Sequence, residues 1–149
     1  MVDNKLVYDL SHRMIEVSHE RKSIHGREVY NAGLGKGDAA FYLSSLEKES
    51  IDCILASDVF IYVGDISALL HESFKCLARK GLIVFTVESY DDEEGEFRLL
   101  KSGRFGHSKQ YIEQVAKLNG FEVLTWEDCI LRQQGGQDVK GATVVLKKI

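Results

Sequence analysis

Apolar positions repeat along the chain with two different periods, one typical of strands and the other of helices. Lys5 to Asp9 predicts a short strand, and Ser11 favours an N-cap for a helix that runs to about Arg21. One face of this helix carries three residues at α-helical spacing: Met14, Val17 and Ser18. A strand followed at once by a helix is the unit from which parallel sheets are built.

The second unit contains a glycine-rich stretch. Glu28 to Ala32 predicts another short strand, Gly33 to Gly37 a loop, and Asp38 the N-cap of a helix. The helix presents four apolar residues on the face expected to point inward: Ala39, Ala40, Leu43 and Leu46.

The middle of the chain gives the clearest pattern. Ile51 to Ala56 predicts a strand, and Asp65 the cap of a helix whose unit ends at Lys80-Gly81. The apolar stripe of that helix consists of Ile66, Leu69, Leu70 and Leu77. The run from Leu82 to Val87 is apolar on both faces, which is typical of a central parallel strand.

The last third of the chain changes the pattern. Ser108 predicts the cap of a helix through Leu118, and Gly120 ends it. Its inward residues are Tyr111, Ile112, Val115 and Ala116. The tail predicts extended segments and one turn: Phe121 to Trp126, Cys129 to Arg132, the turn Gln134 to Gln137, and Ala142 to Leu146. We therefore expect one α/β domain over residues 1–149, with an antiparallel pair ending an otherwise parallel sheet.

Charge and hydropathy narrow the possible partners. The net charge is −4, and Lys and Arg are scattered, so we expect no nucleic-acid surface. Asp91 to Glu94 is a short acidic run typical of a solvated loop. The longest apolar run, Leu82 to Val87, is far below the ~20 residues of a membrane helix, and no signal segment opens the chain. We expect neither membrane insertion nor export.

The cysteines favour a reducing compartment. Cys53, Cys76 and Cys129 are odd in number and form no CxxC pair. Inert thiols in the cytoplasm explain this better than disulfides or a metal site. We therefore expect a cytoplasmic protein without a bound metal.

Three segments carry a resemblance to a known family: Ile51 to Asp65, Arg104 to Ser108, and Cys129 to Arg132. Together they resemble class I S-adenosylmethionine-dependent methyltransferases, in particular the predicted methyltransferases found behind tetratricopeptide repeats. The resemblance covers essentially the whole chain. It implies a Rossmann-like, mostly parallel sheet with a terminal antiparallel hairpin, and methyl transfer from S-adenosylmethionine to an unidentified acceptor.

The same resemblance implies a missing piece. In the family, a strand, a glycine-rich cofactor loop and a helix precede the strand that here ends at Asp9. Only a few residues precede Lys5, so we expect a truncated domain that lacks the usual first strand and helix. The absent strand leaves unpaired backbone groups on both neighbours. We expect the neighbours to close up or a second chain to cover the gap, which predicts a homo-oligomer.

The resemblance places cofactor contacts at the ends of strands. Asp9, with Leu10 and Met14 after it, matches the position whose carboxylate accepts bonds from the ribose hydroxyls, although Asp9 and Ser11 also suit helix capping. Ser57 and Asp58 follow a parallel strand and match the stretch near the methionine end of the cofactor. The alternative is that Asp58 only begins a turn.

Gly33 and Leu34 match the position of an acidic residue that contacts the adenine amino group. The glycine stretch also suggests a nucleotide loop, yet its G-x-G-x-G spacing departs from G-x-G-x-x-G, so a plain loop is the simpler interpretation.

Three residues are candidates for catalysis: Glu88, His107 and Tyr111. Glu88 follows the buried run of the strand and offers a polar side chain to line the site. His107 suits a general base, because the ordinary pKa of histidine is near neutrality. The alternative is that His107 binds a backbone group and orders the loop.

Three functions therefore remain open. The first is a methyltransferase, the second is a non-catalytic remnant that serves as an oligomerisation or interaction module, and the third is a nucleotide-binding protein that uses the Gly33 loop. The acceptor cannot be read from the sequence, because substrate choice in this fold depends on loops of free composition.

Overall fold

The chain was analysed as a computed structural model that describes residues 5–9, 11–20, 23–24, 27–28, 32–90 and 95–149. Its residues form two compact units, Met1–Ser45 and Leu46–Ile149, and each is described by itself. The expectation of one domain over residues 1–149 stays a prediction.

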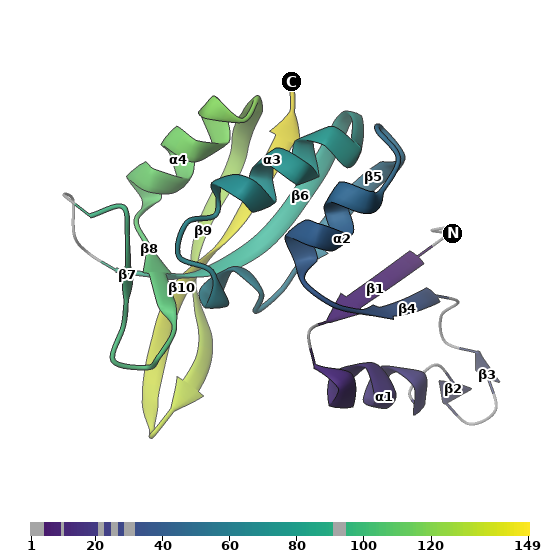
Figure 1. The fold of residues 1–149 in the computed structure, drawn as a ribbon. Coiled ribbons are helices and arrows are strands. Elements are labelled where there is room, and N and C mark those ends of the chain that lie inside the picture. Colours follow the sequence, from purple (N-terminus) through teal and green to yellow (C-terminus); the bar gives the residue numbers. More distant parts are fainter. Residues whose placement is uncertain (1–4, 10, 21–22, 25–26, 29–31, 91–94) are drawn as a thin grey trace. The chain divides into compact units, whose positions relative to one another are not determined.

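The N-terminal unit is built around a parallel pair of strands (Figure 1). Its elements are β1 (Lys5–Asp9), α1 (His12–Glu20), β2 (Ser23–Ile24), β3 (Arg27–Glu28), β4 (Ala32–Lys36) and α2 (Ala39–Ser45). β1 pairs with β4 in parallel from Lys5↔Ala32 to Asp9↔Lys36. The expected strand at the start of the chain and the helix after Ser11 are confirmed.

The glycine-rich stretch is a strand, so the predicted loop is wrong. Residues 32–36 form β4, four residues later than the predicted strand from Glu28 to Ala32, of which residues 29–31 lie outside the described chain. Glycine disfavours strands because it has no side chain to pack. Here the ladder to β1 engages all five residues, and this tertiary pairing overrides the local preference.

The C-terminal unit is a six-stranded sheet with helices on it. Its strands are β5 (Ile51–Ala56), β6 (Leu77–Ser89), β7 (Phe97–Leu99), β8 (Phe105–His107), β9 (Phe121–Gln134) and β10 (Gln137–Lys148). β6 is central, pairing in parallel with β5 and β8 and antiparallel with β10. The strand order is β7-β8-β6-β10-β9, with β5 also on β6.

The antiparallel hairpin of β9 and β10 confirms the expected end of the sheet. Gly135 and Gly136 make its turn with φ of 58° and 77°, a region that glycine enters without steric cost. β7, which pairs antiparallel with β8, was not predicted. Its three residues are too few to show a period in the sequence.

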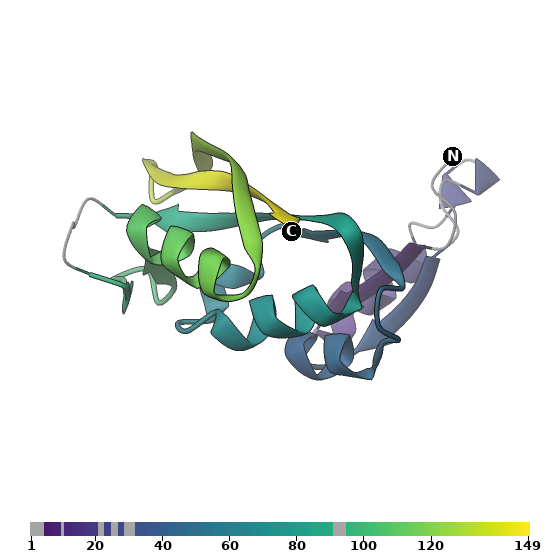
Figure 2. The same cartoon turned by 90° about the horizontal axis from the view of Figure 1, so that it is seen from above.

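Two helices, α3 (Ser67–Cys76) and α4 (Lys109–Leu118), lie side by side over one face of this sheet, and the short η1 (Phe60–Tyr62) follows β5 (Figure 2). The cap of α4 is as predicted, since the Ser108 side chain accepts from the backbone N–H of Tyr111. α3 ends at Cys76, four residues before the predicted Lys80, because Leu77 already pairs with Ile51 as the first residue of β6.

The core of this unit lies between the helices and the sheet. Its apolar side chains with at most 1% exposure are Ile61, Ile66, Leu70, Cys76, Leu77, Ile83, Phe85, Val87, Ile112, Ala116, Ala142, Val144 and Leu146. Along β6, Ile83, Phe85 and Val87 are fully buried, whereas Leu82 and Val84 on the opposite face are half-buried. One face of the central strand is therefore covered completely and the other in part.

Candidate functional site

Ligands of open α/β sheets bind outside the carboxyl ends of parallel strands. In the N-terminal unit, Asp9 is half-buried at that end of β1. Its Oδ1 accepts from the backbone N–H of Ser11 at 2.7 Å, and the Ser11 hydroxyl accepts from the N–H of Met14 at 3.3 Å. Asp9 and Ser11 thus share the capping of α1. Within the described chain, Oδ2 of Asp9 has no hydrogen-bond partner.

The other predicted residues of this unit are less well placed. Leu10 lies outside the described residues, and Met14 is 52% exposed, while the next residue, Ile15, is buried. Gly33 and Leu34 lie inside β4, opposite Leu6 and Val7. Gly33 and Gly35 lie within the strand, and only Gly37 and Asp38 separate it from α2, so the nucleotide-loop interpretation loses the glycine-rich loop that it requires.

In the C-terminal unit, Ser57 and Asp58 are exposed directly after β5. Asp58 has φ of 55°, a region that L-residues other than Asn and Asp rarely enter. Its backbone N–H donates to the Thr86 hydroxyl at 3.0 Å, which fixes this turn to the end of β6. The turn therefore holds two polar side chains, Ser57 and Asp58, at the carboxyl end of the sheet.

Glu88 is buried at the end of β6 and already has partners. Arg132 on β9 donates through Nη2 to its Oε1, and the Ser102 hydroxyl donates to Oε2 at 3.4 Å. Its side chain is 3% exposed. Sequence reasoning gave Arg132 no role, because 44 residues separate the partners and strand patterning does not reveal contacts across a sheet.

His107 holds the loop after β5. Its Nε2 is 3.0 Å from the carbonyl oxygens of both Val63 and Gly64, so Nε2 carries the proton and donates to them. Burial lowers the pKa of His107 below its ordinary value of 6.5. These are the backbone contacts that the loop-ordering interpretation describes, and a neutral, buried ring is poorly placed to collect protons from solvent.

Tyr111 links α4 to the start of α3. Its hydroxyl accepts from the backbone N–H of Ile66 and donates to Oδ1 of Asp65, both at 3.0 Å. Burial is the main cause that raises the pKa of Tyr111 to about 12, so the phenol stays protonated near neutral pH. Hydrogen bonds from Ser67 lower the pKa of the Asp65 carboxyl. Tyr111 and Asp65 therefore fix the entry to α3.

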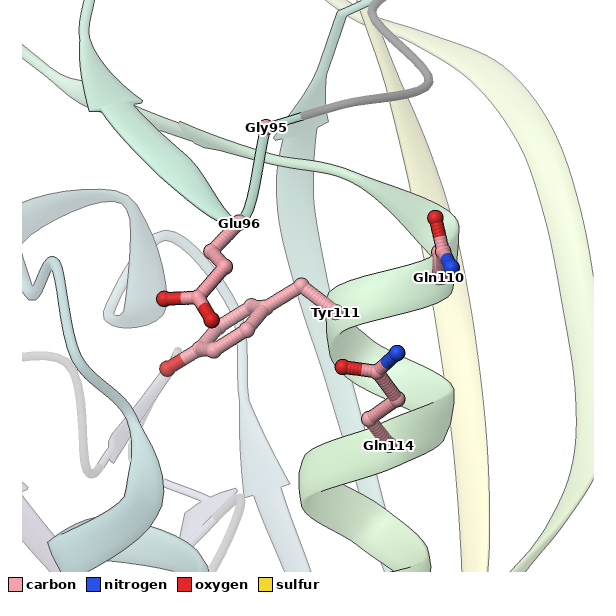
Figure 3. Close-up of a pocket in the computed structure, with 5 residues that line it drawn as sticks. All are labelled: Gly95, Glu96, Gln110, Tyr111 and Gln114. Carbon is pink, nitrogen blue, oxygen red and sulfur yellow. The ribbon is translucent and has the colours of Figure 1, made fainter.

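A surface cavity of about 180 Å³ lies beside α4 (Figure 3). Its lining residues are Gly95, Glu96, Gln110, Tyr111 and Gln114. Tyr111 is the single predicted site residue among them, and its hydroxyl is engaged with Asp65 and Ile66. The cavity is therefore separate from the candidate residues Ser57, Asp58 and Glu88.

Two features are absent from the described part of the chain. No three His, Cys, Asp or Glu side chains there come together as a metal would require. None of its helices is long and apolar enough to cross a membrane.

Comparison with solved structures identifies the fold. A methyltransferase from Methanosarcina mazei, described as S-adenosylmethionine-dependent, superposes with a TM-score of 0.76 at 13% identity, covering 98% of this chain and 82% of its own. A putative S-adenosylmethionine-dependent methyltransferase from Listeria monocytogenes gives 0.72 at 15% identity, covering 97% and 79%. The cyclase SpnF gives 0.76 at 14% identity, covering 96% and 65%. Such low identities establish the fold alone.

Sequence comparison adds the family. No curated protein sequence matches the chain. A family model described as a methyltransferase domain matches residues 3–85, which is more than half of the chain. The chain therefore belongs to the methyltransferase domain family and has the class I fold of S-adenosylmethionine-dependent methyltransferases.

Proposed function

We propose that the chain is a methyltransferase that takes its methyl group from S-adenosylmethionine and transfers it to an acceptor not yet identified. The observation that carries the proposal is the match of residues 3–85 to the methyltransferase domain. Asp9, Ser57 and Asp58 support it, because they lie where this type of sheet binds ligands.

The described residues fit this cofactor in chemistry. Asp9 offers a carboxylate oxygen, Oδ2, without a partner in the described chain, which suits acceptance from two ribose hydroxyls. Ser57 and Asp58 are exposed and polar, which suits the charged amino-acid end. We do not assign Gly33 or Leu34 to the adenine, since both lie within β4. The bound cofactor supplies an electrophilic methyl group on a sulfonium.

The chain would contribute mainly by positioning, since an in-line transfer requires donor and acceptor to be close and aligned. Glu88 contributes a wall on the acceptor side, with its charge balanced by Arg132. His107 and Tyr111 act by holding the segment between β5 and α3, and we assign no proton transfer to them.

Calorimetric titration with S-adenosylmethionine and with its demethylated product tests the proposal. We expect micromolar binding that Asp9→Ala and Asp58→Ala each weaken at least tenfold, since each removes a cofactor contact. Asp138→Ala, an exposed aspartate on β10, is the matched control and should leave binding unchanged. Absence of binding to both compounds, with the chain folded, contradicts the proposal.

The second candidate is an interaction module, which the edge of the six-stranded sheet favours. Within the described strands, β5 pairs with β6 alone, and Leu55 is 77% exposed although parallel strands are usually covered on both faces. We infer that a second copy of the chain covers this edge. Sedimentation should then give a dimer that Leu55→Lys converts to monomer; a wild-type monomer refutes it.

Location and sequence context are two further proposals. We propose a cytoplasmic location, since Cys53, Cys76 and Cys129 are all free thiols. We also propose that relatives of this chain occur beside tetratricopeptide repeats, on the resemblance of its three segments.

A further inference from the structure

Two arginines come together where β6 ends. Arg132 lies on β9 and is bound to Glu88, and Arg104 directly precedes β8. Nη1 of Arg104 donates to Oε1 of Gln134 at 3.1 Å. Because Gln134 and Arg132 are two residues apart on a strand, their side chains share one face of the sheet. We therefore group the two arginines, which both lie against this face of β9, as the Arg104–Arg132 cluster.

This cluster has more hydrogen-bond donors than acceptors. In the described chain, Nε of Arg104 and both Nε and Nη1 of Arg132 are buried without a partner. Arginine stays charged in proteins and offers only donors. Nearly all buried polar groups in folded proteins are paired, so three such donors in one cluster indicate a group that is rich in acceptors.

The charges point to an anion. Glu88 balances Arg132, but Arg104 has no carboxylate partner in the described part of the chain. Its bond goes to the neutral amide of Gln134, which is exposed and free to move aside. A charged acceptor makes a stronger bond to guanidinium than an amide does. The guanidinium also lies 5.9 Å from the ring centroid of Tyr62, which is 60% exposed and offers a flat apolar surface.

We propose that Arg104 and Arg132 bind the oxyanion, carboxylate or phosphate, of a small molecule that displaces Gln134 from Arg104. Tyr62 lies after β5 and Glu88 ends β6, so the anion binds at the carboxyl end of the sheet. That this molecule is the methyl acceptor rests on the proposed function. The anion site itself does not.

The test observes the arginine Nε–Hε signals of the full chain by NMR, without cofactor. The probes are benzoate, whose ring can lie on Tyr62, inorganic phosphate, and benzamide as the uncharged match of benzoate. We expect benzoate or phosphate to shift the signals of Arg104 and Arg132, and benzamide to shift neither. A response to benzoate alone shows that the site binds a carboxylate, and a response to phosphate alone shows that it binds a phosphate.

Variants make the assignment specific. Arg104→Gln should raise the dissociation constant of the responding anion at least tenfold. Arg79→Gln removes the same charge from an exposed site at the opposite end of β6 and should leave the constant unchanged. The inference is overturned if neither anion shifts the signals, or if both variants raise the dissociation constant equally. Cofactor binding measured by calorimetry is independent, so its failure and the failure of this site are distinguishable.

Discussion

The two units of the chain are stabilised in different ways. The C-terminal unit has a continuous core, in which Leu70, Phe85 and Ile112 are no more than 1% exposed. In the N-terminal unit, the buried side chain within the described residues is Ile15, at 8%, and α2 buries none. The start of α1 is held by local hydrogen bonds, such as the one that the Ser11 backbone N–H donates to Asp9.

This difference bears on cofactor binding. Asp9 belongs to the N-terminal unit, and Ser57 and Asp58 belong to the C-terminal unit with its continuous core. A ligand that binds only the folded state stabilises the part that it contacts. We therefore expect S-adenosylmethionine to stabilise the N-terminal unit more than the C-terminal unit.

The largest effect should come from the buried ion pair. Arg132→Ala leaves Glu88 buried without its partner and should lower the free energy of unfolding of the C-terminal unit by about 3–5 kcal/mol. Urea denaturation measures it. The double variant Glu88→Leu/Arg132→Met replaces the pair with apolar side chains and should recover most of the loss. If Arg132→Ala lowers the free energy of unfolding no more than a surface substitution does, the ion pair of Glu88 and Arg132 does not stabilise the C-terminal unit.

The next comparison is between the two cores. Leu70→Ala should cost about 2–5 kcal/mol, because it opens a cavity in a fully packed interior. Ile15→Ala should cost less, since the Ile15 side chain is 8% exposed whereas that of Leu70 is fully buried. Denaturation monitored by hydrogen exchange in each unit gives the free energy of unfolding of each variant. Comparing the two losses checks this order. An equal or larger loss for Ile15→Ala contradicts the contrast between the units.

Tyr111→Phe should cost about 1–3 kcal/mol, because it leaves the buried N–H of Ile66 without an acceptor. It should also change the response to alkali. The folded-state pKa is about 12 against an ordinary 10.0, so the stabilising contribution is intact below pH 10 and is lost as pH rises toward 12. Urea midpoints between pH 9 and 11 should fall more steeply for wild type than for Tyr111→Phe.

The smallest effect should be the acid response of His107. Burial lowers its folded-state pKa below 6.5, so its contribution to stability is present above about pH 6.5 and decreases as pH falls. His107→Gln keeps a side-chain N–H donor for the carbonyls of Val63 and Gly64 but does not titrate. Its unfolding midpoint should change less between pH 7.5 and 5.5 than that of wild type. His71→Gln, at an exposed position, should behave as wild type.

Elements with a strong period were predictable from sequence. The boundaries of β1 and β5, the cap at Ser108 and the terminal hairpin agree with expectation. β4 was misplaced by four residues because pairing with β1 decided its position, and nothing local to Gly33 or Gly35 signals that partner.

Prediction of the site was limited in a similar way. Asp58 could be placed after a strand from the apolar run that precedes it. The pairing of Glu88 with Arg132, and the contact of His107 with the carbonyls of Val63 and Gly64, join segments more than 40 residues apart. A single sequence shows which residues are polar but does not show these long-range partners.

The most direct test of the central claim is hydrogen exchange of the whole chain with and without the demethylated product of S-adenosylmethionine. We expect slower exchange in α1, which follows Asp9, and in η1, which follows Asp58, with little change in the hairpin of β9 and β10. Unchanged exchange in α1 and η1 at saturating concentrations would contradict the proposal that Asp9 and Asp58 contact the cofactor.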